Sequence, residues 1–419
     1  MHQPLQEIPL EIIEIILALC DPIDVAAFAQ TASLYRSLIY ETADEHLWRS
    51  LYLSQPFDDP RACVDFLGER RKEVKWRDEL QQVIRVRTLL KDPERVDFPQ
   101  DDRRGALETL WHMASHVIPT NRAFSEEISD NQLWVAAMLR GGRVLHSPGM
   151  TIEDRHLAAK LHTHFGMTPQ DMKPSARAAS RAYCYDFRNY NWENHFGPFV
   201  PDGSGNVNWV HMQALHHVLS MHILDLGETT ELGEDFMFTI FPMSMPFCQP
   251  IIPEDEDSDL LEDWAGVTGP WTCAYCFCDH RELLVYNDLV AETLEDEAPN
   301  TIVFDHPEFE EVFTSLPDVV FKITSTEHDP DHPDRPTINF KGEMGHFQMQ
   351  GYVKMTPDNQ IRWHFVSGEQ GQAVWSSEGV QVGGVRSLFG VLGSWTTVFH
   401  DAADPVGPFW LRKVYRVPE

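Results

Sequence analysis

Apolar side chains recur every three to four residues near the start of the chain, which is the spacing of one face of an α-helix. The first run, residues 9–19, forms a broad apolar face with Glu11 and Glu14 opposite it. Asp21-Pro22 is typical of a helix that stops and restarts, because Asp caps helices and Pro fits the first turn. Similar runs up to residue 52 predict four short helices. So small a module cannot bury all this apolar surface, and part of it is expected to await a partner.

The same helical spacing continues through the middle of the chain. Residues 58–120 repeat apolar positions between charges and are expected to be helical. Further helices are predicted near residues 131–140, 151–164, 174–189 and 208–224. A segment over 191–205, rich in Asn, Gly and Pro, is predicted to be a loop.

The pattern changes after about residue 230, where β-branched and aromatic residues begin to alternate with polar ones. A strand is expected over 236–241, an acidic solvated loop over 254–263, and a buried strand over 271–277 that runs into a helix. Later strands are predicted over residues 319–325, 337–341, 347–355, 360–366, 374–381, 395–399 and 409–417. Turn residues separate these runs, which favours an antiparallel meander closing into a barrel or a sandwich.

These patterns together predict an α+β fold in three parts. The parts are a helical module over residues 1–55, a helical region over 56–230 and a β-rich domain over 231–419. A length of 419 residues is enough for two or three domains.

The charge balance excludes some classes of function. The 33 basic and 65 acidic residues give a net charge of −32 at pH 7. Nucleic acids and anionic membranes both attract basic surfaces, so neither is an expected partner. The acidity serves solubility first, and selection of basic substrates is the alternative.

The cellular location is predicted from cysteines and apolar segments. Seven cysteines, an odd number, favour a reducing compartment over a disulfide framework. There is no run of about 20 apolar residues and no signal-peptide pattern at the start. We therefore expect a protein of the cytoplasm or nucleus.

Residues 5–52 resemble the F-box, a helical module that docks proteins onto the Skp-family adaptor of cullin–RING ubiquitin ligases. Ile8-Pro9 stands where the family has Leu-Pro, and Arg36 takes the basic position of the third helix. Two longer segments match in order and spacing: Asp21-Pro22-Ile23-Asp24-Val25 and Leu47-Trp48-Arg49-Ser50-Leu51-Tyr52. The departures are Ile8 for Leu and Thr31-Ala32-Ser33 in place of a more basic segment.

This resemblance implies a binding role. The chain is expected to be a substrate receptor of an SCF-type ligase, which binds the adaptor and cullin core and an unknown protein substrate. It is not expected to be an enzyme or to use a cofactor. The residues implied to face the adaptor are Pro9, Ile12, Ile13, Ile16, Val25, Leu47 and Trp48. The alternative is a generic helical cap that packs on its own protein.

The rest of the chain is similar, at lower specificity, to a large set of uncharacterised fungal F-box proteins. The blocks that carry this similarity are Asp186–Tyr190, His195–Phe199, Val207–His211, Asp263–Val267, Cys276–Asp279, Trp375–Gly383 and Asp404–Trp410. The similarity implies one common architecture and no known substrate. By analogy with other F-box proteins, the β-rich domain is expected to bind the substrate.

Aromatic residues of the β-rich domain supply the candidate substrate-binding site. We expect Trp363, Trp375 and Trp395 to line a barrel mouth or groove, with Arg386 as an anchor for a carboxylate or phosphate. The same tryptophans are also suited to the core, and Arg386 to a surface salt bridge. A second hypothesis is a small-ligand-binding barrel, with the tryptophans around a cavity and the helices as a scaffold.

A metal site is the remaining alternative. Cys273, Cys276, Cys278 and His280 lie within eight residues, but structural zinc sites draw ligand pairs from two separated knuckles. Buried cysteines on a strand explain the segment better, so no metal is expected. His211, His216, His217 and His222 share one helix and are expected at its surface or at the edge of the core. The sequence lacks the motifs G-x-S-x-G, H-E-x-x-H and the P-loop.

Overall fold

The computed structural model describes residues 8–42, 44–92, 95, 97–121, 128–224, 240–252, 263–291, 300–306, 309–369 and 371–414. The helices expected after residue 130 are confirmed, except that the one expected over 174–189 ends at Cys184 and a separate 3-10 helix follows over Phe187–Asn189. The mixed α+β class is also confirmed. The strand expected over 236–241, the acidic loop over 254–263 and the boundary at residue 230 fall mostly outside the described residues.

Four short helices form the N-terminal module, as the apolar pattern predicts. They are α1 (Leu10–Leu17), α2 (Pro22–Ala29), α3 (Ser33–Tyr40) and α4 (His46–Leu53). The Asp21 carboxylate accepts a hydrogen bond from the backbone N–H of Ile23, which caps α2 as expected. The core of the module extends onto the next helix, since Leu80 is buried within it.

The helical region contains α5 (Trp76–Leu89), α6 (Gln100–Ser115), α7 (Asp130–Leu139), α8 (Ile152–Phe165), α9 (Pro174–Cys184), η2 (Phe187–Asn189), α10 (Trp209–Ile223) and η3 (Met245–Cys248). The prediction of helix over residues 58–120 is confirmed for α5 and α6 and is wrong up to Lys75, in the described residues between these two helices and after Ser115. The segment up to Lys75 turns back on itself, and Val64 forms β-bridges with Arg70 and Val117. The turn at Gly68, with φ of +83°, explains why the apolar spacing there does not make a helix.

Eight strands form one closed antiparallel barrel. They are β1 (Gly269–Cys278), β2 (Glu311–Glu327), β3 (Thr337–Met344), β4 (Phe347–Met355), β5 (Ile361–Glu369), β6 (Gln372–Val382), β7 (Gly390–Thr397) and β8 (Gly407–Lys413). Each strand pairs with the next in sequence, and β8 pairs back with β1, where Cys273 lies opposite Leu411. Helix α13 (His280–Ala291) follows β1, as the sequence indicates.

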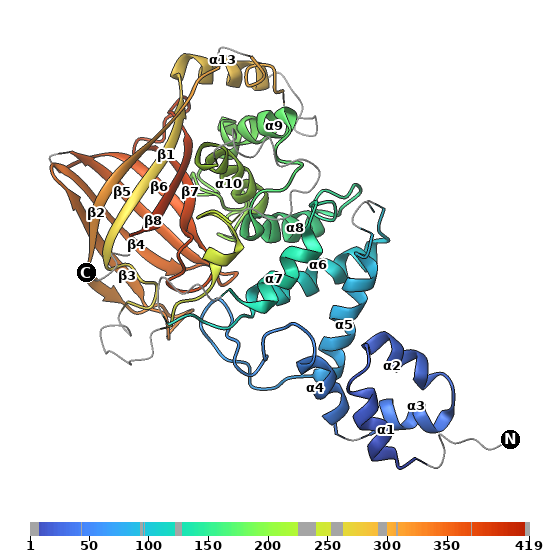
Figure 1. The fold of residues 1–419 in the computed structure, drawn as a ribbon. Coiled ribbons are helices and arrows are strands. Elements are labelled where there is room, and N and C mark those ends of the chain that lie inside the picture. The colour runs from blue at the N-terminus through green and yellow to red at the C-terminus, as the bar shows by residue number, and fades with distance from the viewer. Residues whose placement is uncertain are drawn as a thin grey trace.

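The helical region packs directly on the barrel wall. Figure 1 shows α8, α9 and α10 beside the strands, while α1 to α3 lie at the far end of the molecule, beyond α5. One continuous core contains Leu215 and Val218 of α10 together with Val380 and Leu392 of the strands. The helical region is therefore part of the same folded body as the barrel and not a separate spacer.

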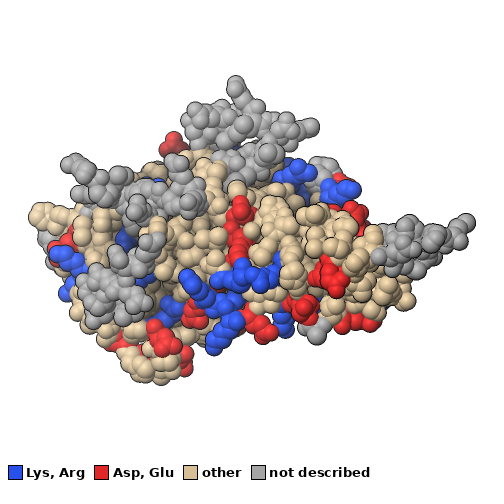
Figure 2. Space-filling model, turned by 60° about the horizontal axis from the view of Figure 1, so that its bottom comes forward, with Lys and Arg blue, Asp and Glu red and all other residues tan. Residues whose placement is uncertain are grey.

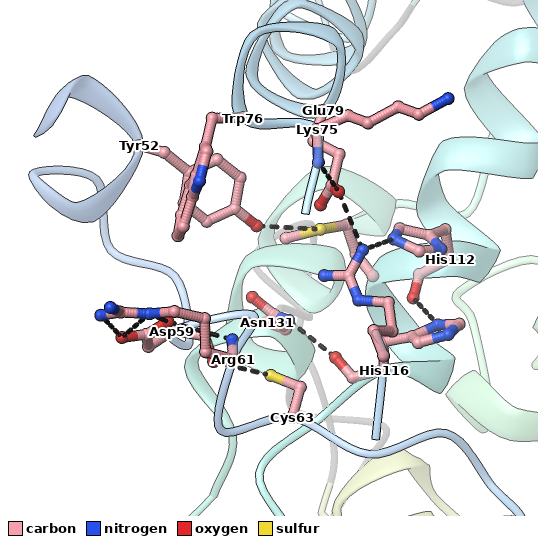
Figure 3. A network of polar contacts seen from close by, with 12 residues as sticks. Tyr52, Asp59, Arg61, Cys63, Lys75, Trp76, Glu79, His112, His116 and Asn131 are labelled. Atoms are coloured by element: carbon pink, nitrogen blue, oxygen red, sulfur yellow. Dashed lines mark hydrogen bonds and ion pairs between the residues drawn. The ribbon is translucent and has the colours of Figure 1, made fainter. Parts of the chain in front are cut away.

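A polar network of the helical region lies beside Tyr52, at the end of the N-terminal module (Figure 3). The Tyr52 hydroxyl of α4 contacts the Met113 sulfur of α6 at 3.9 Å. Arg71 donates to the Glu79 carboxylate at 2.9 Å and to Nε2 of His112 at 3.3 Å. Burial of His112 lowers the pKa of its imidazole to about 3, so the ring is neutral and accepts this bond. The module itself is joined to α5 by two other contacts: the Trp76 backbone N–H donates to the Glu45 carboxylate at 3.0 Å, and Arg87 donates to the Asp21 carboxylate at 2.8 Å.

Basic side chains interrupt the acidic surface. Figure 2 shows a band of Lys and Arg near the middle of one face, with Asp and Glu on either side of it. The net charge of −32 therefore does not spread as a uniform acidic field over this face.

Candidate functional site

An apolar stripe runs along the outer surface of α1 and α2. Its members, with their exposed fractions, are Ile12 (46%), Ile15 (60%), Ile16 (50%), Leu19 (85%) and Ile23 (47%). Large aliphatic side chains are rarely exposed together, and such a patch marks an interaction surface in a folded protein. The stripe exists because α1 carries more apolar residues than its buried face can use.

The expected adaptor-binding residues divide between this stripe and the core. Pro9, Ile12 and Ile16 are exposed, as the prediction requires. The other four are buried in the core of the module and present no side chain to a partner: Ile13, Val25, Leu47 and Trp48. Trp48 also donates its indole N–H to the Ile39 carbonyl at 3.0 Å, which fixes it inward. Ile15, Leu19 and Ile23 of the stripe are not among the residues that the resemblance implies. Ile15 and Leu19 follow Ile12 at helical spacing, whereas Ile23 lies on α2.

The interior of the barrel is packed with side chains. Trp363 is fully buried there, with its ring 5.2 Å from Trp271 and 5.4 Å from Phe340. Its indole N–H donates to the Gln381 side chain at 3.2 Å. The expectation that Trp363 binds substrate is therefore corrected, since it is a core residue. A filled interior counts against a barrel that encloses a small ligand.

One end of the barrel is closed by a plug. Trp264 and Val267, just before β1, are buried in the interior cluster. The indole N–H of Trp264 donates to the Pro336 carbonyl at 2.8 Å. Arg386 lies at this plugged end, where its guanidinium donates to the Asp263 carbonyl at 3.0 Å. Arg386 is thus bonded to the plug, in the connection between β6 and β7. Trp375 and Trp395 lie near the opposite end of these two strands, so Arg386 does not form a site with them.

The opposite end of the barrel forms an aromatic mouth. Trp395 pairs with Ser377, which pairs with the interior residue Phe365, so Trp395 points inward. Trp375, two residues before Ser377, has the same orientation, and its ring is 5.2 Å from that of Trp395. We call Tyr275, Phe277, Val312, Trp375 and Trp395 the barrel mouth. Phe277 and Val312 are 37% and 43% exposed, and the other three are half-buried.

A second exposed aromatic surface lies beside the mouth, where the chain leaves β7. Trp192 and Phe399 are 71% and 70% exposed. The ring of Phe196 stacks on His400 with centroids 4.0 Å apart, and Trp192 packs edge-on against both. His195, Phe196 and His400 all have φ between +54° and +57°. Such backbone strain in residues other than glycine is typical of functional surfaces.

Two buried carboxylates fix the walls that support these surfaces. Glu378 accepts two hydrogen bonds from Arg362, at 2.8 and 2.9 Å, and a third contact joins it to His364 at 2.8 Å. Burial alone raises the pKa of Glu378, but the hydrogen bond to His364 and the charge of Arg362 outweigh burial and lower it. Glu311 similarly joins β2 to α9 and α10 through Arg181 and His222.

The cysteine and histidine segment does not assemble a site. Cys273 faces the barrel interior, whereas Cys276 and Cys278 face the helices. His280 is exposed at the start of α13. Burial raises the pKa of both Cys273 and Cys278 to about 12, so these thiols stay protonated.

The histidines of α10 are more buried than the sequence indicates. His211, His216 and His217 are each 1% exposed, and only His222 is half-buried. Each finds a polar partner: His216, for example, donates to the Met243 carbonyl at 2.8 Å. The prediction of a surface or edge position is therefore wrong for three of the four.

Comparison with known proteins gave no relative. No family model matches the chain, and neither a curated protein nor a solved structure does. Among the described helices, none combines the length and the apolar character needed to cross a membrane. The functional argument therefore rests on the two apolar surfaces, at the N-terminal module and at the barrel mouth.

Proposed function

We propose that the chain is a substrate receptor of an SCF-type cullin–RING ubiquitin ligase. The observation that carries the proposal is the apolar stripe on α1 and α2, at the distal end of a four-helix module. The module buries its own core and still leaves Ile12, Ile15 and Ile16 about half exposed. A Skp-family adaptor is the partner that the sequence resemblance implies for this surface.

The barrel mouth is the proposed substrate site. It offers aromatic side chains on rigid strands, which suit an apolar anchor residue of a protein substrate. The contacts that α5 makes with Glu45 and Asp21 of the module support a fixed distance between the adaptor and the mouth. The chain then acts by proximity, bringing a substrate lysine near the charged conjugating enzyme, and contributes no catalytic group.

Adaptor binding tests the first half of the proposal. The double substitution Ile12→Asp and Ile16→Asp is expected to weaken binding of a Skp-family adaptor at least about a hundredfold. The reason is that each isoleucine side chain contributes roughly 1.5–3 kcal/mol when the adaptor buries it. The matched control is Ile152→Asp, since Ile152 is 74% exposed on α8, away from the module. Titration calorimetry with purified proteins measures both. Wild-type chain that does not bind, or a double variant that binds normally, contradicts the proposal.

The mouth has its own test. Trp375→Ala is expected to reduce substrate ubiquitination by roughly tenfold or more, since a central aromatic anchor contributes about 2 kcal/mol or more to binding. Adaptor binding should stay unchanged. Ile152→Ala is the control, because Ile152 is apolar and 74% exposed on α8 of the helical region, outside the mouth strands. Quantitative proteomics measures which proteins are ubiquitinated only when the chain is present. Equal sets for Trp375→Ala and wild type contradict the proposal that the mouth binds substrate.

A further inference from the structure

Three potential metal ligands converge within the helical region, outside both apolar surfaces. They are His146, His162 and Asp171, and one ligand atom from each lies within 4.8 Å of the other two. They come from three separate segments: the turn after α7, helix α8 and the turn after α8. His162 and Asp171 are buried, at 4% and 2% exposure, whereas His146 is exposed. The group is thus anchored inside the protein and open to solvent on one side.

The backbone around the cluster is built for close approach. Gly141 and Gly142 both have positive φ, which turns the chain back toward α8 before His146. A Cβ atom on Gly142 would lie 2.7 Å from the Thr168 side chain. Only glycine therefore lets this turn pack against residue 168, and the packing is what brings His146 to the other two residues.

Hydrogen bonds already hold the ligand atoms near coordination distance. His162 Nε2 lies 2.9 Å from Asp171 Oδ2, close to the roughly 3.3 Å that separates two ligands of a tetrahedral zinc ion with bonds of about 2.0 Å. The Thr168 hydroxyl donates to Asp171 Oδ2 at 2.7 Å and lies 3.2 Å from His146 Nε2. An ion replaces these bonds, and His162 coordinates as a neutral imidazole through Nε2, with its one ring proton moved to Nδ1.

We propose that His146, His162 and Asp171 bind one divalent transition-metal ion of the zinc class. Two imidazoles and a carboxylate are a common zinc ligand set, which leaves the fourth position to water. A supporting contact orients the carboxylate residue, since His217 of α10 donates from Nε2 to the Asp171 carbonyl at 3.0 Å. The Ser180 hydroxyl, 2.7 Å from His217 Nδ1, extends this support to α9. The ion cross-links the segments on which α9 and α10 rest.

Zinc titration of the full-length chain tests the site. Chelator-treated protein is expected to bind one equivalent of Zn²⁺, measured with a competing chromophoric chelator, and its Tm is expected to rise with Zn²⁺. His146→Ala should weaken zinc binding at least tenfold and remove the rise in Tm, and its exposed position makes misfolding no concern. His156→Ala is the control on the same α8, outside the cluster.

The outcomes are separable. Tight binding that His146→Ala loses and His156→Ala keeps supports the site. Zinc that binds equally to wild type and His146→Ala, or that changes no Tm, overturns it. Because the experiment uses no adaptor and no substrate, its result is independent of the proposed role in ubiquitin transfer.

Discussion

Lowering the pH from 7 to 5 is expected to destabilise the protein by about 6 kcal/mol through three buried histidines alone. Burial lowers the pKa of His164 and His211 to about 3 and that of His216 to about 4. In the unfolded chain each imidazole has a pKa of about 6.5 and takes up a proton at pH 5. This proton uptake stabilises the unfolded state by about 2 kcal/mol per group. The loss rivals the whole stability of a typical domain.

The direction of this effect follows from the depressed pKa values. Above about pH 6.5 these three histidines cause no loss of stability. As the pH drops from 6.5 toward 4, the free energy of unfolding falls steadily, because only the unfolded chain binds the protons in this range. Urea denaturation at pH 7 and pH 5 measures it. The variant His211→Gln should lessen the pH dependence by about one proton. Equal urea midpoints at the two pH values would contradict the expectation.

Replacement of Glu378 by alanine is the substitution expected to destabilise the barrel most, by about 3–5 kcal/mol. Glu378 is 5% exposed and is the shared partner of Arg362 and His364. Its removal leaves the Arg362 guanidinium buried without a carboxylate. The backbone at Gly197 also lies on Glu378, since a Cβ there would be 2.5 Å from the Glu378 Cβ. Alanine keeps this Cβ, so the close packing against Gly197 is retained and the expected loss comes from the ion pair.

The control for Glu378→Ala is Glu369→Ala, at an exposed position at the end of β5. It should change the free energy of unfolding by less than about 0.5 kcal/mol. Guanidinium denaturation followed by tryptophan fluorescence measures both variants. If Glu378→Ala unfolds at the same denaturant concentration as Glu369→Ala, the ion pair does not stabilise the barrel as described.

The strands were more predictable than their closure. Alternation located β4 at residues 347–355, because each inward residue there is apolar and each turn is marked by Pro, Asn or Gly. The start of β7 was missed, since Gly390 and Gly393 carry no side chain that reveals alternation. Gly393 is needed because a Cβ there would lie 2.1 Å from the Glu378 carbonyl. Pairing of β8 with β1 is a long-range contact that local patterns do not encode.

The candidate sites were predictable only as regions. The width of the apolar face on α1 indicated more apolar surface than the module can bury. Periodicity does not say which side of the helix turns inward, and Ile13 rather than Ile12 is the buried residue. Trp363 and Trp395 both point into the barrel, so the alternation of their strands does not distinguish them. Their positions along the barrel axis make Trp363 a core residue and Trp395 a mouth residue. The His146, His162 and Asp171 cluster gives no sequence signal, because its spacing follows from the two-glycine turn and α8 together.

The closure of the barrel has a consequence for protein synthesis. The N-terminal module leaves the ribosome first, whereas β1 cannot gain its second neighbour until β8 has been translated. Until then β1 and β7 are open edges, which are prone to pair with other chains. A nascent chain thus exposes its apolar stripe while the barrel mouth is still incomplete. Early stop codons before residue 407 are expected to yield aggregation-prone chains that still carry the apolar stripe.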